Sequence, residues 1–185
     1  MADTIEQPRP RIDAATPTRA PALDPLEFRR VMGRFATGVA VITTTDADGA
    51  PLGITVNSLS SVSLEPALVM WSIDLRASSL DSLRRAGTFA INLLPVGAIE
   101  LGQHFARRAD DRFAGVPYEI GPLGLPLLQG MLAHLCCRTW ARYPGGDHEI
   151  VVGEVHYVRG WDVDPLVFQS GRFTRLAAGT LVPGR

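Results

Sequence analysis

The hydrophobic and polar pattern predicts one helix near the start of the chain, before any strand. Asp24 is placed to cap this helix, Pro25 suits its first position, and Glu27 can return a hydrogen bond to the cap. The apolar positions that follow share a helical spacing: Phe28, Val31, Met32 and Phe35. We expect Gly38 to end this helix.

Downstream, β-branched and apolar segments predict strands over 39–45, 52–57, 67–73, 88–94, 132–143, 149–159 and 166–168. Asp46-Ala47-Asp48-Gly49 separates the first two and is typical of a hairpin turn. Helices are expected from Ser78 or Ser79 to Gly87 and over 99–108. Because strands outnumber helices and several are joined by hairpin turns, the pattern predicts a mainly β fold with peripheral helices, an antiparallel barrel.

Residues 1–23 show no hydrophobic period and carry four prolines, so we expect a disordered N-terminal tail there. The remaining residues, 24–185, are expected to form one domain, since a chain of 185 residues can bury one sizeable core.

Charge narrows the function classes. Charged residues make up 20% of the chain and the formal net charge is -1, so the basic footprint of nucleic-acid or anionic-membrane binding is absent. All 18 basic residues are arginines. The absence of lysine excludes Schiff-base chemistry, a pyridoxal phosphate anchor and a P-loop lysine, which leaves arginine and backbone N–H groups to hold a phosphate.

The two cysteines, Cys136 and Cys137, are neighbours and cannot form a disulfide framework or a four-cysteine zinc site. Neither a signal peptide nor an apolar run of membrane-spanning length is evident, so we expect a cytoplasmic protein. His148 and His156 are eight residues apart on one predicted strand, too far to share a metal ion, and we expect no metal site.

Familiar catalytic motifs are missing from the sequence. There is no G-x-G-x-x-G after a strand, no G-x-S-x-G elbow and no helical pair of zinc-binding histidines. These absences disfavour a Rossmann domain, an α/β-hydrolase and a zincin.

A polar stretch over 53–63 offers many hydroxyl and amide groups without net charge, which suits a sugar-like ligand or a flavin's ribityl chain and ring edge. Ser78 and Ser79 at a helix start, with Arg76 upstream, could seat a phosphate. His148 follows a glycine turn and could present a donor to a ligand. Each feature has a structural alternative: turn and cap residues for the serines, and a polar strand end for His148.

The segment Asp110-Asp111-Arg112-Phe113 combines a guanidinium with an aromatic ring, and it equally suits stacking or a solvated loop.

Taken in order, the motifs resemble those of the flavin reductase family over residues 24–176. The matching segments are Phe35-Ala36-Thr37-Gly38-Val39-Ala40-Val41-Ile42-Thr43, the stretch 53–66, Phe89-Ala90-Ile91-Asn92-Leu93-Leu94, Asp111-Arg112-Phe113, Gly146-Asp147-His148 and Pro165-Leu166-Val167-Phe168.

This resemblance implies an FMN-binding split barrel and a set of ligand contacts. Contacts to the flavin ring edge and ribityl-phosphate are implied at Thr55, Val56, Asn57, Ser58 and Ser61. Other flavin contacts are implied at Ser78 and Ser79 on the phosphate side, Phe89 and Asn92 beside the isoalloxazine, and Arg112 and Phe113 near its outer part. Nicotinamide contacts are implied at His148, taken as the catalytic histidine, and at Ser170, Gly171 and Phe173.

More narrowly, the chain is similar to the reductase component of two-component flavin-dependent monooxygenases. It is therefore expected to transfer hydride from NADH or NADPH to FMN or FAD and to supply reduced flavin to a partner monooxygenase. Two alternatives remain: a non-catalytic flavin-binding protein, and a split-barrel oxidase acting on an organic substrate. An apolar fraction of 46%, together with the resemblance, favours a homodimer.

Overall fold

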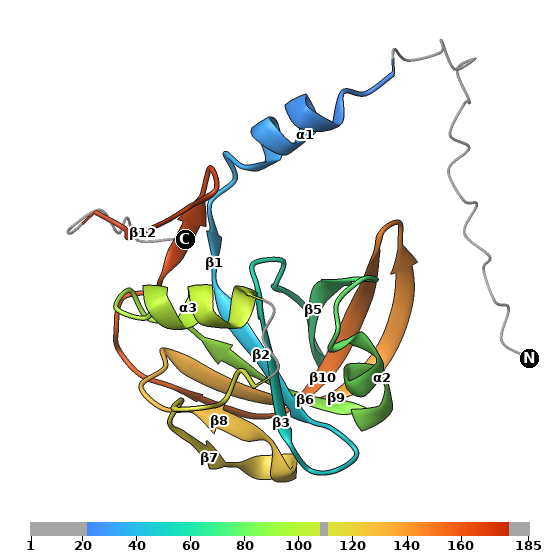
Figure 1. The fold of residues 1–185 in the computed structure, drawn as a ribbon, viewed down its shortest axis with the longest axis vertical. Coiled ribbons are helices and arrows are strands. Elements are labelled where there is room, and N and C mark those ends of the chain that lie inside the picture. The colour runs from blue at the N-terminus through green and yellow to red at the C-terminus, as the bar shows by residue number, and fades with distance from the viewer. Residues whose placement is uncertain (1–21, 108–110, 178–185) are drawn as a thin grey trace, which may run out of the picture.

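A seven-stranded antiparallel sheet forms the body of the computed structural model, which describes residues 22–107 and 111–177 (Figure 1). In spatial order its strands are β3 (Pro51–Val56), β2 (Ala40–Thr45), β6 (Thr88–Leu93), β9 (Ala133–Gly145), β10 (His148–Gly160), β5 (Ala67–Asp74) and β4 (Ser60–Leu64). Contacts between β3 and β5 show that the sheet curls round on itself. The predicted antiparallel barrel with peripheral helices is confirmed.

Smaller elements surround this sheet. One three-stranded sheet contains β1 (Thr37–Gly38), β11 (Val167–Gln169) and β12 (Arg172–Thr174), and a two-stranded sheet contains β7 (Tyr118–Ile120) and β8 (Pro126–Leu128). The helices are α1 (Pro25–Met32), α2 (Leu80–Ala86), α3 (Ile99–Ala106) and a 3-10 turn at Pro122–Gly124. Figure 1 shows α2 and α3 outside the barrel on different sides, while α1 projects away from it.

Local chemistry explains the predicted hairpin. Asp46 Oδ1 accepts hydrogen bonds from the backbone N–H groups of Asp48 and Ala50, and Gly49 adopts a φ of 82° that favours glycine. The turn therefore places Thr45 opposite Pro51 and sets the register of β2 with β3.

Alternation along the strands buries one face inside the barrel. Trp71, Phe89, Ile91 and Val151 are each at most 1% exposed there, and the Trp71 and Phe89 rings meet edge to face with centroids 5.5 Å apart. A second apolar cluster lies under α3 and includes Phe105 and Leu166. The elements around the site therefore rest on two packed cores.

The first helix differs from its prediction. Asp24 Oδ1 caps it as expected, through the N–H of Leu26, but the helix ends at Met32 and none of its residues is buried. The helix stops because the carbonyl groups that follow it accept hydrogen bonds from the C-terminal hairpin and not from helical N–H groups. Gly33 O accepts from Ser170 N at 2.6 Å, and Arg34 O accepts from the Gln169 side chain. Glu27 pairs with Arg30 instead of returning a bond to the cap.

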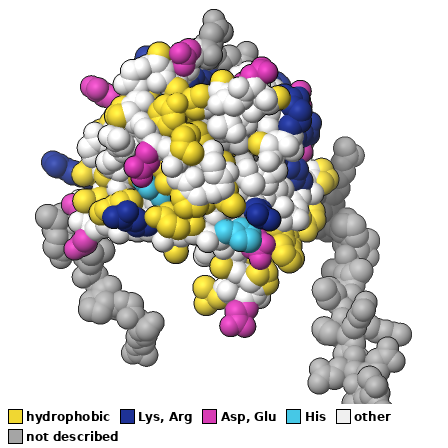
Figure 2. Space-filling view, turned by 90° about the horizontal axis from the view of Figure 1, so that it is seen from below, with side chains coloured by type: hydrophobic (Ala, Val, Ile, Leu, Met, Phe, Trp, Pro, Cys, Tyr) yellow, Lys and Arg dark blue, Asp and Glu magenta, His cyan; other side chains and the backbone are white. Residues whose placement is uncertain are grey.

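Five further strands of two to five residues, β1, β4, β7, β8 and β12, were not predicted, because segments this short carry little apolar pattern of their own. Residues 1–21 of the predicted tail, and Arg108 at the end of the helix predicted over 99–108, lie outside the described residues. Within 22–107 and 111–177, no helix is both long enough and apolar enough to cross a membrane. Figure 2 shows acidic, basic and apolar side chains interspersed on one face.

Candidate functional site

A cavity of about 370 Å³ opens between β3, the end of β5, the segment before α2 and the end of α3. Its lining combines apolar and charged groups: Ile54, Asp74, Arg76, Ala77, Ser78, Ser79, Phe105, Ala106 and Arg112. Three of the residues predicted to contact a flavin, Ser78, Ser79 and Arg112, are thus brought to one cavity.

Two guanidinium groups supply positive charge to this cavity. Arg112 Nη1 donates to Gly53 O at 2.8 Å, which fixes its side chain against β3. Arg76 forms a two-point contact with Asp74, with Nη2–Oδ2 at 2.8 Å and Nε–Oδ1 at 3.1 Å. The side-chain hydrogen bond from Arg76 holds the pKa of Asp74 well below its usual range. Both arginines are therefore placed where an anionic group could be bound.

Ser79 carries the clearest sign of a missing polar partner. It is 6% exposed, and its Oγ has no hydrogen-bond partner among the described residues. A buried hydroxyl without a partner is unfavourable, so a ligand oxygen or water in the cavity would satisfy it. Ser79 is the N-cap residue of α2, one of the two predicted positions, but its side chain makes no cap bond there.

The polar stretch after β3 divides into structural and exposed positions. Thr55 Oγ1 donates to Gly102 O at 2.8 Å, and Ser58 Oγ bonds both backbone groups of Ser72. Val56 is 8% exposed and faces the barrel core. Asn57 and Ser61 are exposed, although Asn57 Nδ2 also donates to Thr37 Oγ1. None of these five residues lines the cavity, and their flavin contacts stay predictions.

Three other predicted contact residues are buried. Phe89 is 1% exposed inside the barrel, and Phe113 is 7% exposed between Phe105 and Tyr118. Asn92 is fully buried, where Nδ2 donates to Val41 O and Thr43 Oγ1, and Oδ1 accepts from Leu128 N. Their side chains support the strands around the site, and direct flavin contact stays a prediction for each of them.

His148 is not a lining residue, but it lies opposite Asp74, which lines the cavity. The ladder between β10 and β5 pairs it with Asp74, and Leu75 N donates to Asp147 O at 3.0 Å. His148 Nδ1 is 2.7 Å from Asp147 Oδ1, so within the described part of the chain Nε2 has no hydrogen bond. The imidazole is thereby oriented with one nitrogen available to a ligand.

The other predicted nicotinamide-binding residues lie elsewhere. Ser170 and Gly171 form the turn between β11 and β12, both with positive φ, and Phe173 packs against Phe168. Figure 1 shows this hairpin and the β9–β10 turn on opposite sides of the molecule. Within one chain, the structure does not bring Ser170, Gly171 and Phe173 together with His148.

Sequence reasoning missed two features that shape the cavity. A Cβ at Gly53 would lie 2.5 Å from the Phe105 ring, so only glycine lets α3 approach β3 this closely. Asp74, which orients Arg76, was also not identified. A glycine inside a predicted strand was the sequence signal that could have identified Gly53. No sequence signal identified Asp74.

Comparison with known proteins identifies the family. The family model for the flavin reductase like domain matches residues 32–177. The reductase subunit HsaB of a flavin-dependent monooxygenase from Rhodococcus jostii is 38% identical over 165 residues, which cover 89% of this chain and 84% of that protein. The FMN reductase (NADH) SmoA from Agrobacterium fabrum is 41% identical over 150 residues, which cover 81% and 85%.

Solved structures agree with this match. Nitrilotriacetate monooxygenase component B from Mycobacterium thermoresistibile superposes with a TM-score of 0.83 at 33% identity, covering 86% of this chain and 90% of that one. An NADH:FAD oxidoreductase from Streptomyces globisporus, solved in complex with NAD and FAD fragments, gives a TM-score of 0.81 at 38% identity, covering 87% and 99%. The sequence, the fold and the composition of the cavity thus lead to one conclusion: the chain belongs to the family of proteins with a flavin reductase like domain.

Proposed function

We propose that this protein is an NADH:flavin oxidoreductase that supplies reduced flavin to a partner monooxygenase. The observation that carries the proposal is the cavity itself, which is lined by Arg76, Arg112 and two serines and whose Asp74 pairs with His148 in the sheet. Relatives named as NADH-dependent flavin reductases and as monooxygenase reductase subunits support it.

A flavin nucleotide fits the chemistry of the lining. Its phosphate would be held by Arg76, Ser78 and the unpartnered hydroxyl of Ser79. The apolar side chains of Ile54 and Phe105 offer a surface for the ring system. FMN and FAD share these groups, so both are candidate ligands.

When bound, flavin supplies a two-electron acceptor that takes a hydride directly from NADH. The protein then needs to hold two rings about 3 to 3.5 Å apart, without a dedicated acid or base. His148 would orient the nicotinamide nucleotide through Nε2, while Asp147 fixes its ring. This division of roles accounts for a cavity whose described lining holds no catalytic triad and Asp74 as its single carboxylate.

The two other functions considered from the sequence have less support. A flavin-binding protein without catalysis would not need a histidine held in one orientation opposite the cavity-lining Asp74. An oxidase acting on an organic substrate is not suggested by the names of the matched relatives, which are flavin reductases.

A homodimer is part of the proposal because one chain separates the predicted nicotinamide-binding residues. The β11–β12 hairpin, which carries Ser170 and Phe173, lies across the molecule from the β9–β10 turn, which His148 follows (Figure 1). A shared nicotinamide site would therefore need one set of residues from each of two copies. Apolar side chains left exposed on β5 and β9 favour the same arrangement: Met70, Trp140 and Tyr143.

The proposed compartment is the cytoplasm, since Cys136 and Cys137 are free, buried thiols. Burial raises the pKa of Cys136 to about 11 and that of Cys137 to about 12, so neither is an activated nucleophile.

The test of the function is direct. Purified protein mixed with NADH and either FMN or FAD should oxidise NADH with flavin-dependent turnover, followed as loss of nicotinamide absorbance. Anaerobic incubation should accumulate free reduced flavin. Flavin binding without NADH oxidation would contradict the reductase and favour the flavin-binding protein.

A further inference from the structure

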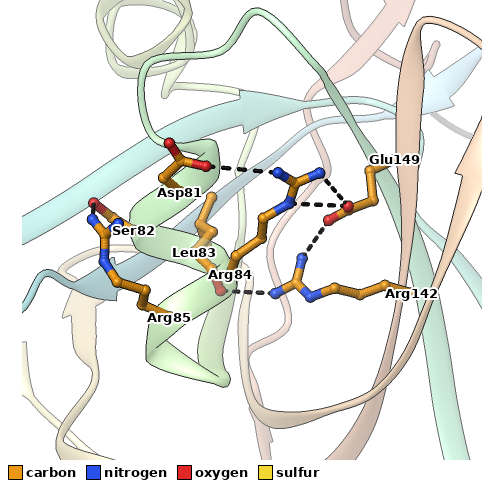
Figure 3. A network of polar contacts seen from close by, with 7 residues as sticks. All are labelled: Asp81, Ser82, Leu83, Arg84, Arg85, Arg142 and Glu149. Carbon is orange, nitrogen blue, oxygen red and sulfur yellow. Dashed lines mark hydrogen bonds and ion pairs between the residues drawn. The ribbon is translucent and has the colours of Figure 1, made fainter.

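Glu149 joins two parts of the molecule through a pair of guanidinium groups (Figure 3). Its Oε2 accepts from Arg84 at 2.7 Å and 3.1 Å, and its Oε1 accepts from Arg142 at 2.7 Å. The carboxylate side chain is only 12% exposed. Such a carboxylate satisfies two charges at once and holds both in defined positions.

The three residues come from three different elements. Arg84 belongs to α2, Arg142 to β9 and Glu149 to β10. Arg142 Nη2 also donates to Leu83 O of α2 at 2.7 Å, so the helix is tied to the β9–β10 hairpin by two connections (Figure 3). The network therefore fixes where α2 lies relative to this hairpin.

Both tied elements lead directly to the candidate site. The segment Arg76–Ser79, which lines the cavity, runs straight into α2 at Leu80. His148 is the first residue of β10 and the chain neighbour of Glu149. A shift of α2 against the hairpin would therefore change the distance between the proposed phosphate site and the proposed nicotinamide site.

We propose that Glu149 is a positioning residue for hydride transfer, which holds the flavin-binding segment and His148 at the separation the two rings need. The proposal rests on the proposed function, because it assigns Glu149 a role in that same reaction. Glu149 would touch neither ligand and would act through Arg84, Arg142 and the elements that carry them.

The charges of this network are suited to a fixed connection. The hydrogen bond from Arg84 lowers the pKa of Glu149, so the carboxylate stays ionised throughout the neutral range. The groups facing it from the packed elements are the two arginines, with Asp81 of α2 3.6 Å from Arg84. The connection should therefore persist through turnover without titrating.

The test is Glu149→Gln in the full chain. The amide keeps the shape but loses the charge, and one of its two positions can no longer accept. Because small misplacements slow a reaction between oriented groups, we expect the single-turnover rate of flavin reduction by NADH to fall about tenfold. Dissociation constants for FMN, by fluorescence quenching, and for NAD⁺ should stay within about twofold of wild type, because each ligand keeps its own residues.

Matched variants separate positioning from general destabilisation. Asp81→Asn removes a charge from the same network without breaking the connection of α2 to β10, and should reduce flavin at the wild-type rate. Glu154→Gln, on the same strand, loses only the pair with His156 and should also be unchanged. Arg84→Gln should slow flavin reduction as Glu149→Gln does. Arg84→Lys, which keeps a charged donor, should retain most of the wild-type rate.

A wild-type reduction rate in Glu149→Gln and Arg84→Gln would overturn the proposal. So would a slow rate explained wholly by weaker binding of one ligand. If Glu149→Gln does not fold, Arg84→Gln decides the question, since Arg84 lies on a partly exposed helix face. Failure of the proposed function would look different, because the wild-type protein itself would then not oxidise NADH.

Discussion

His148 shows how a single hydrogen bond determines what a side chain offers to a ligand. Its Nδ1 lies 2.7 Å from Asp147 Oδ1, and the ladder places the residue opposite Asp74. With one ring nitrogen held, the other makes no hydrogen bond within the described chain and is available to a ligand. Ser79 presents the converse case, a buried hydroxyl that makes no bond within the described chain.

We expect His148→Ala to raise the KM for NADH about 2- to 10-fold, the range that corresponds to one lost hydrogen bond of about 0.5 to 1.5 kcal/mol. Flavin affinity should not change. Asn or Gln at this position should retain more activity than Ala, because the role is orientation and not proton transfer. Steady-state kinetics at saturating flavin measure this, with His156→Ala on the same strand as the control. Equal kcat/KM for wild type and His148→Ala would show that His148 does not bind the nicotinamide nucleotide and is only a polar residue at the end of a strand.

Asn57→Ala combined with Ser61→Ala should weaken flavin binding, with about 0.5 to 1.5 kcal/mol lost for each uncharged hydrogen bond. Both side chains are exposed, so folding should survive. Flavin affinity is measured by fluorescence quenching, and thermal melting checks the fold. An unchanged affinity in the double variant would show that these two residues do not contact the ligand.

At the scale of elements, the barrel depends on close approaches that only glycine permits. A Cβ at Gly153 of β10 would overlap the Phe89 ring, and one at Gly53 of β3 would meet Phe105. The first approach keeps an aromatic side chain inside the barrel, and the second keeps α3 near the cavity.

Gly153→Ala should therefore lower the free energy of unfolding by about 1 to 3 kcal/mol, the usual effect of overpacking a core. Gly160→Ala on the same strand is the matched control, because its Cβ would come no closer than 3.8 Å to Ala133. Urea denaturation of the two variants measures the difference. Equal stability would mean that the Phe89 ring moves aside without loss.

The network of Glu149 predicts a pH dependence of stability. Arg84 lowers the pKa of Glu149 in the folded protein below its ordinary value of 4.5. The unfolded chain thus binds a proton first as the pH falls, so the stabilisation is complete above pH 4.5 and is lost at lower pH. Glu149→Gln should be less stable than wild type at pH 7, and the gap should narrow towards pH 3. A gap that is constant with pH would show that the carboxylate charge contributes nothing.

For the whole molecule, the exposed apolar surface is the main unexplained feature of the single chain. The large apolar residues of α1 are half to three-quarters exposed, among them Leu26 at 76% and Phe28 at 53%. On the barrel, Trp140 is 56% exposed. Surfaces of this kind are usually covered by another protein surface.

We expect light scattering to give a mass of twice the 20.0 kDa chain at micromolar concentration, since a homodimer would cover this surface. Trp140→Glu should shift the mass towards the monomer, because a carboxylate in an apolar interface is unfavourable. A monomer mass for the wild type would contradict the dimer and also the nicotinamide site shared between copies.

Local signals made much of the fold predictable from sequence. The Asp46–Gly49 turn and the strands on either side of it are determined by neighbouring residues, so a short window of sequence predicts them. The antiparallel barrel was predicted from these hairpins. The end of α1 was not predictable, because it depends on a hydrogen bond from Ser170, far along the chain. The partners Arg84 and Glu149 are 65 residues apart, and no short-range pattern connects them. Among the predicted flavin contacts, Ser78, Ser79 and Arg112 line the cavity. The serines were singled out by their place before a helix, and the resemblance added the expectation that all three contact a flavin.

The lack of burial in α1 bears on how this protein assembles. A helix of eight residues is marginal in water unless packing supports it, and no side chain of α1 is buried within its own chain. The helix is therefore only marginally stable in a single chain. The first residues anchored to the rest of the molecule are Gly33 and Arg34, which bond to the C-terminal hairpin. If a second copy covers α1, part of the association free energy goes into ordering this segment. Folding of α1 and pairing of chains would then be one coupled event, with the affinity set partly by the helix propensity of eight residues.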